Sequence, residues 1–321
     1  MNLSSLKTLA TALLLSVASI SITFAQDFPN RRLTLIVGFA AGSGADVLTR
    51  YYGAKLSLDI GQPVIVENKP GANGALAAQA VLQSKPDGYT VLFAPSASMS
   101  GGKFLYANLP YDSQKDFVVI APLLDNGFVL AVSANSPVHS VAELTAFVKS
   151  KPTARYGTAN STGIAAAQLY KTLAGIQATQ VAYKTTGDAV PDLADGTLDF
   201  MFLDGVFALS QLKTGKVRLL ATVGSRIAGA PDVPTMEEAG LKGYGFSVWW
   251  MIAVPTGTPK EAVDRLNVAF NRISELPETK AFLATAAASP LTGTPEATAV
   301  KLAKDIETWA ELARAGGITP Q

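Results

Sequence analysis

The stretch LTLIVGFAAGSGADVLTRYYGAKL places a Gly- and Ala-rich segment with one carboxylate, Asp46, between an expected buried strand at 33–37 and an expected helix. Gly42, Ser43 and Gly44 allow the backbone to turn tightly, so that its N–H groups approach a bound group closely. The helix that follows directs the positive end of its dipole to the same place. This combination is suited to holding an anion.

Two nucleotide-binding motifs also place a Gly-rich turn between a strand and a helix, and their spacing excludes both. After Gly42 and Gly44, the dinucleotide motif requires a third Gly at the position of Val47. The NTP motif requires a Lys followed by Ser or Thr after its second Gly, whereas Gly42 is followed by Ser43 and Gly44. A turn that binds nothing remains the alternative, because short Gly-rich turns of this kind are common.

Small, polar, Gly-containing segments follow an expected strand and precede an expected helix at four places. In open α/β sheets, ligands bind beyond the carboxyl ends of the strands, so such loops from both halves of the chain indicate one cleft facing two domains. Their hydroxyl groups suit an oxygen-rich anion, although each is equally consistent with a helix N-cap. The segments are GFAAGSGAD, ENKPGANGA, APSASMSGG and GTANSTGIAA, and the hydroxyls include those of Ser96, Ser98, Ser161 and Thr162.

Two charged side chains follow expected strands on the same carboxyl side. Asp204 ends one of these strands, where a carboxylate lines the cleft, caps a helix or serves a hinge. Lys184 follows another and either neutralises an anionic ligand as a mobile point charge or is solvated. Trp249 and Trp250 belong to one expected strand, whose pleat turns their side chains to opposite faces. Either both are core or domain-interface aromatics, or one of them stacks in the cleft.

The elements that position these residues alternate short β-branched runs with longer amphipathic stretches, which is the pattern of an α/β protein. Two helix starts carry a capping-box signal, Ser140 with Glu143 and Thr258 with Glu261. The expected strands are 33–39, 64–68, 90–94, 128–133, 154–158, 179–183, 199–203, 218–223 and 249–254, and the expected helices include 45–56, 75–83, 141–150, 165–175 and 261–276.

The first residues indicate export. Lys7 is the only charge before an apolar segment at 9–24, and small residues precede Gln26. This is the pattern of a cleavable signal peptide at 1–25, in preference to a retained membrane anchor. We therefore expect a periplasmic mature chain that starts at Gln26.

Composition limits the functions of that mature chain. It contains no Cys, which excludes disulfides, thiolate catalysis and Cys-ligated metals. Without Lys7 its 25 basic residues balance its 25 acidic ones, so no nucleic-acid surface is implied. About 296 residues exceed what one core usually holds, and 48% apolar residues are enough to fill two domains.

General bases for enzyme chemistry are scarce. The single His, His139, precedes the Ser140 helix start, where a residue packs at the helix entry or faces water. A Ser-His-Asp triad on a nucleophile elbow would need a G-x-S-x-G pentapeptide, which the chain lacks. Too few His and Cys residues exist for a zinc site. We expect neither catalysis nor a metal or cofactor.

Eight segments, in collinear order over essentially the whole mature chain, carry a resemblance to a known family. The chain resembles the solute-binding proteins of tripartite tricarboxylate transporters, which are bacterial periplasmic receptors. The segments are LIVGFAAGSGADVLTR, GQPVIVENKPGANGALAA, KPDGYTVLFAPSA, LPYDSQKDF, ARYGTANSTG, VAYKTTGDAVPDLADGTLDFMFLD, PDVPTMEEAG and VPTGTPKEAVDRLN.

The resemblance implies a two-domain periplasmic binding protein fold, of the type II-like kind, whose ligand cleft lies between domains. The implied domains are 26–127 with 249–321, and 128–248. In the family, the first strand-to-helix loop and a loop of the second domain grip a ligand carboxylate. The implied ligand-binding residues are Phe39, Ala40, Ser43, Gly44 and Asp46 in the first loop, Asn160, Ser161 and Thr162 in the second, and Ser96 and Asp204 at further cleft positions, with Lys184 added from its own position after a strand.

Departures from the family pattern bear on ligand choice. The chain has Gly38 before Phe39 where a Pro is usual, Ala182 where another Pro is usual, and Thr185 in place of a Gly, and it lacks a His in STGIAAAQLY. Asp46 near a bound carboxylate would repel it. Either Asp46 turns back to cap its helix, or it meets the ligand through water or at a donor group.

The sequence therefore predicts a receptor that captures a small organic carboxylate by domain closure, in the manner of a Venus flytrap. A dicarboxylate or aromatic carboxylate is the preferred cargo, membrane permease subunits are the partners, and the receptor is a monomer. A receptor that signals to a sensor is an alternative. An exported hydrolase is a second alternative, disfavoured by the missing general bases.

Overall fold

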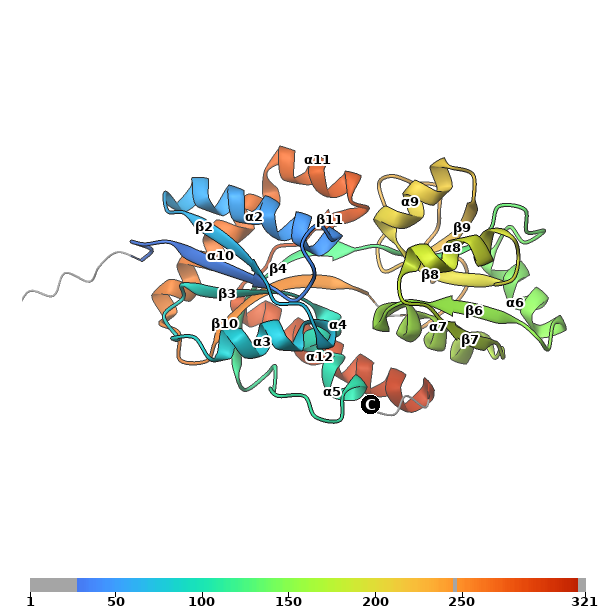
Figure 1. Ribbon diagram of the computed structural model, residues 1–321, viewed down its shortest axis with the longest axis horizontal. Helices are drawn as coiled ribbons and strands as arrows, with labels where there is room; N and C mark the ends of the chain where they lie inside the picture. The colour runs from blue at the N-terminus through green and yellow to red at the C-terminus, as the bar shows by residue number, and fades with distance from the viewer. Residues whose placement is uncertain (1–27, 245–246, 317–321) are drawn as a thin grey trace, which may run out of the picture.

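The computed structural model describes residues 28–244 and 247–316, and the predicted signal peptide lies outside these ranges. Two sheets, each with helices on both faces, form two lobes side by side (Figure 1). This arrangement confirms the predicted α/β class. Within the described ranges, we find no helix with the length and apolar character needed to cross a membrane.

The first sheet has six strands in the order β11-β4-β10-β3-β1-β2. Helices α2 (Gly44–Ile60), α10 (Lys260–Glu275) and α11 (Pro277–Thr285) cover one face, and α3 (Ala75–Leu82) and α12 (Pro295–Gly316) cover the other. β1 pairs in parallel with β2 and β3, and β10 runs antiparallel to β3 and β4. The strands are β1 (Leu33–Val37), β2 (Val64–Asn68), β3 (Thr90–Pro95), β4 (Phe117–Asn126), β10 (Trp249–Pro255) and β11 (Ala288–Pro290).

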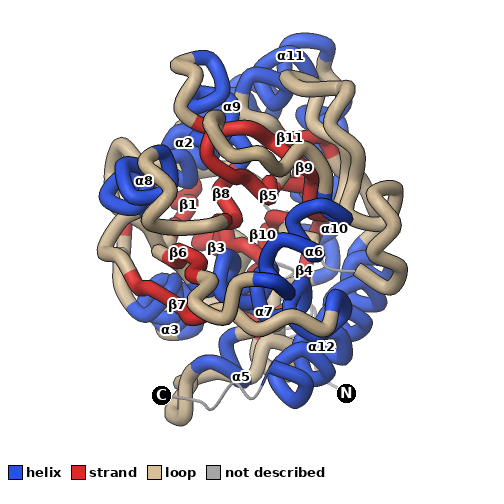
Figure 2. The backbone as a smooth tube through the Cα atoms, turned by 90° about the vertical axis from the view of Figure 1, so that its right-hand side faces the viewer, coloured by secondary structure: helices blue, strands red, loops and turns tan. Residues whose placement is uncertain are grey.

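The second sheet has five strands in the order β7-β6-β8-β5-β9. Helices α6 (Val141–Ser150) and α7 (Ser161–Ala174) lie on one side of it, and α8 (Thr186–Ala194) and α9 (Gly205–Lys213) on the other (Figure 2). The strands are β5 (Phe128–Ser133), β6 (Arg155–Thr158), β7 (Thr179–Ala182), β8 (Phe200–Asp204) and β9 (Val217–Val223), and three short helical segments belong to the first lobe, η2 (Ala72–Gly74), α4 (Ser96–Met99) and α5 (Gly102–Leu105).

Three segments join the lobes. Gly127 alone separates β4 from β5, and the segment 224–248 leads from β9 back to β10. Helix α12 starts under the first sheet and ends beside α7, where Trp309 is fully buried in the core of the second lobe (Figure 1). The strands of the first sheet fall within the predicted domain 26–127 with 249–321, and those of the second sheet within 128–248. That these two parts are separate domains stays a prediction.

Backbone atoms of the two lobes are in direct contact at Gly127. The N–H of Gly205 donates to the Gly127 carbonyl at 2.7 Å, and the N–H of Gly127 donates to the Ala287 carbonyl at 3.1 Å. Ala287 adopts a φ of 50°, in the region that favours glycine. The backbones of the two lobes are therefore hydrogen-bonded directly to each other at this point.

The two capping-box predictions have different outcomes. Ser140 Oγ accepts from the Glu143 N–H at 3.1 Å, so the first helix start is confirmed. The prediction at Thr258 is wrong, because its hydroxyl donates backward to the Pro255 carbonyl at 2.8 Å and α10 begins at Lys260 without a side-chain cap. The Thr258 hydroxyl therefore stabilises the turn before the helix and does not cap the helix itself.

The glycine contact predicts a selective effect of Gly205→Ala. A Cβ there would lie 2.5 Å from the Ala287 Cβ and 2.8 Å from the Gly127 carbonyl oxygen, so we expect a loss of about 1–3 kcal/mol in unfolding free energy. Gly44 is a matched control, since it also opens a helix and has nothing within 4 Å of its Cβ direction. Urea denaturation should find Gly44→Ala nearly neutral, and equal losses in both variants would contradict the packing argument.

Candidate functional site

A cleft of about 760 Å³ lies between the lobes, at the ends of strands from both sheets. Two sets of side chains line it, one polar and one apolar. The polar set comprises Ser43, Asn73, Asn126, Asn160, Thr162, Asp204, Ser210 and Thr285, and the apolar set includes Phe39, Val47, Leu48, Phe128, Val206, Phe207, Val248, Trp250 and Phe282.

The N-cap residues of three helices line this cleft, from both lobes. Each cap side chain accepts a backbone hydrogen bond from the first turn of its own helix, which fixes the helix end. First-turn N–H groups have no acceptor within a helix, and they carry the positive end of its dipole. The bonds are Asp46 N–H to Ser43 Oγ at 3.3 Å in α2, Gly163 N–H to Asn160 Oδ1 at 2.8 Å in α7, and Phe207 N–H to Asp204 Oδ1 at 2.9 Å in α9.

The charge of the cleft is unusual for an anion site. Among the described residues, no Lys, Arg or His lines it, and its one charged side chain is Asp204. Helix N-termini are therefore the source of positive charge among the described lining residues, which include the first-turn residues Gly44 and Ala45 of α2 and Thr162 of α7. This arrangement can hold a carboxylate through backbone and amide donors alone.

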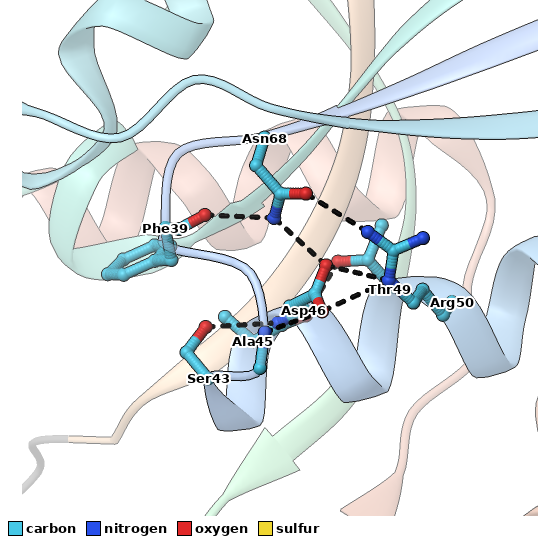
Figure 3. Close-up of polar contacts among 8 residues, drawn as sticks. Phe39, Ser43, Ala45, Asp46, Thr49, Arg50 and Asn68 are labelled. Carbon is cyan, nitrogen blue, oxygen red and sulfur yellow. Dashed lines mark hydrogen bonds and ion pairs between the residues drawn. The ribbon is translucent and has the colours of Figure 1, made fainter.

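Asp46 is buried and does not line the cleft, and its carboxylate points toward Asn68 and Arg50 (Figure 3). Its carboxylate accepts from the Gly42 N–H at 2.9 Å, from Asn68 Nδ2 at 2.9 Å and from Arg50 Nε at 3.0 Å. The Arg50 hydrogen bond, with those from Gly42 and Asn68, lowers the pKa of Asp46 to about 2. Asp46 thus turns back on its own chain, but it is Ser43, not Asp46, that caps the helix, and contact of Asp46 with ligand stays a prediction.

Asn68 ties the same loop to the end of β2. Its amide donates to the Phe39 carbonyl at 3.0 Å as well as to Asp46, and its oxygen accepts from Arg50 at 3.1 Å (Figure 3). The segment between β1 and α2 is thus held by β1, which it follows, and by Asn68 at the end of β2. Ser43 and Gly44 of this segment lie at the cleft surface. Hydrogen bonds within the protein therefore fix the shape of this loop.

One wall of the cleft is aromatic. The Phe39 ring lies 5.6 Å from that of Trp250, which in turn lies 5.4 Å from Phe93. Trp250 packs on the α2 face of the first sheet and Trp249 on the α12 face, so the prediction of opposite faces is confirmed. This wall offers an apolar surface to the body of a ligand.

The structure brings six of the predicted site residues to the cleft, namely Phe39, Ser43, Gly44, Asn160, Thr162 and Asp204. Four others do not line it. The carboxylate of Asp46 is hydrogen-bonded within its loop, as described above. Ser96 is buried, and its Oγ accepts from the backbone N–H of Trp249 at 3.3 Å. Lys184 and Ala40 are exposed and are not among the residues that line the cleft. Ligand contact by these four stays a prediction, and the side chain of Ser161 lies outside the described part.

Sequence reasoning missed several lining residues. Asn73 belongs to a Gly-containing loop that the sequence did single out, and its φ of 50° reflects that turn. Asn126, Phe282 and Thr285 carried no signal, because they reach the cleft only through the packing of β4 and α11. His139 is exposed at the start of α6, and within the described ranges no group of metal-ligating side chains is found.

Comparisons with known proteins are consistent across sequence and structure. A family model for "Tripartite tricarboxylate transporter family receptor" matches residues 48–318. A UPF0065 protein of Bordetella bronchiseptica is 33% identical over 98% of this chain and 94% of its own length. R. palustris Rpa4515, solved with adipate, has a TM-score of 0.81 at 30% identity over 92% of this chain and 100% of its own. MatC of Rhodopseudomonas palustris, with bound malate, has a TM-score of 0.75 at 30% identity over 89% and 99%.

The internal role of Asp46 predicts a pH-dependent effect of Asp46→Asn. Because its pKa falls from 3.8 to about 2 on folding, the stabilisation is complete above pH 4 and is lost as the pH falls to 2. Arg50 is half exposed, so we expect a loss of about 1–2 kcal/mol at pH 7. Urea denaturation at several pH values should show this loss vanish near pH 2.

Asp264→Asn is the matched control for that experiment, since Asp264 also pairs with a cation four residues away, Lys260, but is itself half exposed. We expect a change of at most about 0.5 kcal/mol. If Asp46→Asn were equally mild at pH 7, the carboxylate would not be holding the loop.

Proposed function

The chain belongs to the tripartite tricarboxylate transporter family of receptors, and from this premise we propose that it captures a small organic carboxylate and delivers it to a membrane permease. Receptors of this family are periplasmic. The proposal also includes export through a signal peptide at 1–25, which leaves a mature chain that starts at Gln26. The mature receptor acts as a monomer and has no enzymatic activity.

One observation carries the proposal, the convergence of the α2 and α7 N-termini on a cleft without a basic side chain among its described residues. Backbone N–H groups bind carboxylate oxygens with charge-assisted hydrogen bonds, which are stronger than neutral ones. Because the two helices belong to different lobes, one carboxylate or two held there would draw the lobes together. Capture would thus be coupled to a hinge motion between them.

The solved relatives support this choice of ligand class. Rpa4515 was solved with adipate and MatC with malate, and both are small aliphatic dicarboxylates. In this chain the polar donors of the cleft face an aromatic wall with Phe39 and Trp250. The cleft therefore suits either a dicarboxylate or an aromatic carboxylate, with the carboxyl group at a helix end and the carbon skeleton on the wall.

Thermal melting tests the proposal directly. We expect a class of acids from a panel of aliphatic and aromatic mono-, di- and tricarboxylates to raise the melting temperature of ligand-free protein. At about a hundredfold excess over Kd, mass action stabilises the native state by about 2.7 kcal/mol, which for a protein of this size raises the melting temperature by about 4–5 °C. A folded protein that responds to no acid would overturn the proposal.

Gly44→Val separates helix-end binding from other modes. Its side chain would cover the first N–H groups of α2, where nothing now lies within 4 Å, so we expect affinity to fall by about tenfold or more. Gly187→Val is the control, since Gly187 lies in the first turn of α8 and does not line the cleft. Calorimetry should find its affinity unchanged, and an unaffected Gly44→Val variant would argue against the helix end.

A further inference from the structure

Asp204 creates an electrostatic problem for an anion receptor. It is the one charged side chain among the described cleft residues, and it has the same sign as a carboxylate ligand. None of the ion pairs within the described part of the chain includes it. The carboxylate of Asp204 therefore meets the cleft without a cationic partner.

Asp204 cannot easily turn away from the cleft. It ends β8 opposite Phe128, and its Oδ1 is held by the Phe207 N–H at 2.9 Å. The next residue, Gly205, is fixed by its hydrogen bond to Gly127 at the contact between the lobes. Hydrogen bonds on both sides thus hold Asp204 in place at the cleft.

The surroundings of Asp204 leave it as a strong acceptor. Within the described ranges no side chain donates a hydrogen bond to Asp204, and of the residues that line the cleft with it, Phe128, Val206 and Phe207 have no side-chain donor. Burial raises the pKa of Asp204, and the backbone N–H groups of Phe207 and of Asp204 itself oppose this by stabilising the charged form. A buried acceptor that is incompletely satisfied gains most from a ligand that brings a donor.

Building on the proposed function, we infer that Asp204 accepts a hydrogen bond from a hydroxyl or ammonium group of the ligand. The cargo is then a hydroxy- or amino-substituted carboxylic acid, with its carboxylate at the helix N-termini and its donor at Asp204. An unsubstituted acid leaves Asp204 unpaired, and a second carboxylate placed there is repelled. Asp204 is on this account the residue that selects among carboxylates.

Matched acids test this inference in two series. The first is succinate, malate and aspartate, and the second is 3-phenylpropanoate, phenyllactate and phenylalanine; within each, the substituent changes from hydrogen to hydroxyl to ammonium. Calorimetry on ligand-free protein should show, in the series that binds, that the hydroxy or amino acid is about tenfold or more tighter than the unsubstituted acid. Whichever of the hydroxy acid and the amino acid binds more tightly shows whether a hydroxyl or an ammonium group donates to Asp204.

Asp204→Asn provides the decisive variant, because its Oδ1 still accepts from the Phe207 N–H and the helix cap is kept. We expect the preference for the substituted acid to fall by about tenfold for an ammonium and less for a hydroxyl, while the unsubstituted acid binds more tightly. Asp188→Asn is the control, since it makes the same change in net charge in the exposed first turn of α8. It should leave every ratio unchanged.

The outcomes separate this inference from the proposed function. If acids bind but the unsubstituted member is equal or tighter, or if Asp204→Asn leaves the ratios unchanged, the role of Asp204 is refuted and the carboxylate receptor stands. If neither these acids nor the wider panel binds to folded, ligand-free protein, the proposed function itself fails, and the inference fails with it.

Discussion

The backbone contact among Gly127, Gly205 and Ala287 determines where the site can form. It holds the two lobes together at the point where the chain passes from one sheet to the other, with no room for a Cβ at either glycine. The N-terminus of α9 starts directly at this contact, and the cleft opens beside it. Because the lobes are joined there by hydrogen-bonded backbone, the helix ends that line the cleft keep a defined position in each lobe.

Two aspartates near helix starts have opposite roles, and their surroundings decide which. Asp46 is surrounded by donors from Gly42, Asn68 and Arg50, so its charge is satisfied within the loop and shapes it. Asp204 accepts from backbone N–H groups and, within the described ranges, from no side chain, so part of its accepting capacity faces the cleft. The first carboxylate shapes a loop that lines the cleft, and the second lies in the cleft itself. In our proposal, the helix ends attract the carboxylate of the ligand and Asp204 selects among ligands.

The α/β class, the loops at the carboxyl ends of the strands and the opposite faces of Trp249 and Trp250 followed from local periodicity, which the sequence displays directly. Other features depend on tertiary contacts. The strand β4 contains Pro122 near a register shift, so its pattern is interrupted, and it was not among the expected strands. The contacts of Asp46 with Asn68 join residues 22 apart, and Phe282 reaches the cleft from the far end of the chain. Sequence spacing identified which loops line the cleft, but not which side chain in each loop faces it.

A structure of the protein with a bound carboxylate tests the central claim most directly. The account predicts carboxylate oxygens within hydrogen-bond distance of first-turn N–H groups at Gly44 or Ala45 and at Thr162, with no basic side chain in contact and with Asp46 still bonded to Gly42 and Asn68. A carboxylate held instead by a Lys or Arg side chain, or bound outside the cleft between the lobes, would contradict it.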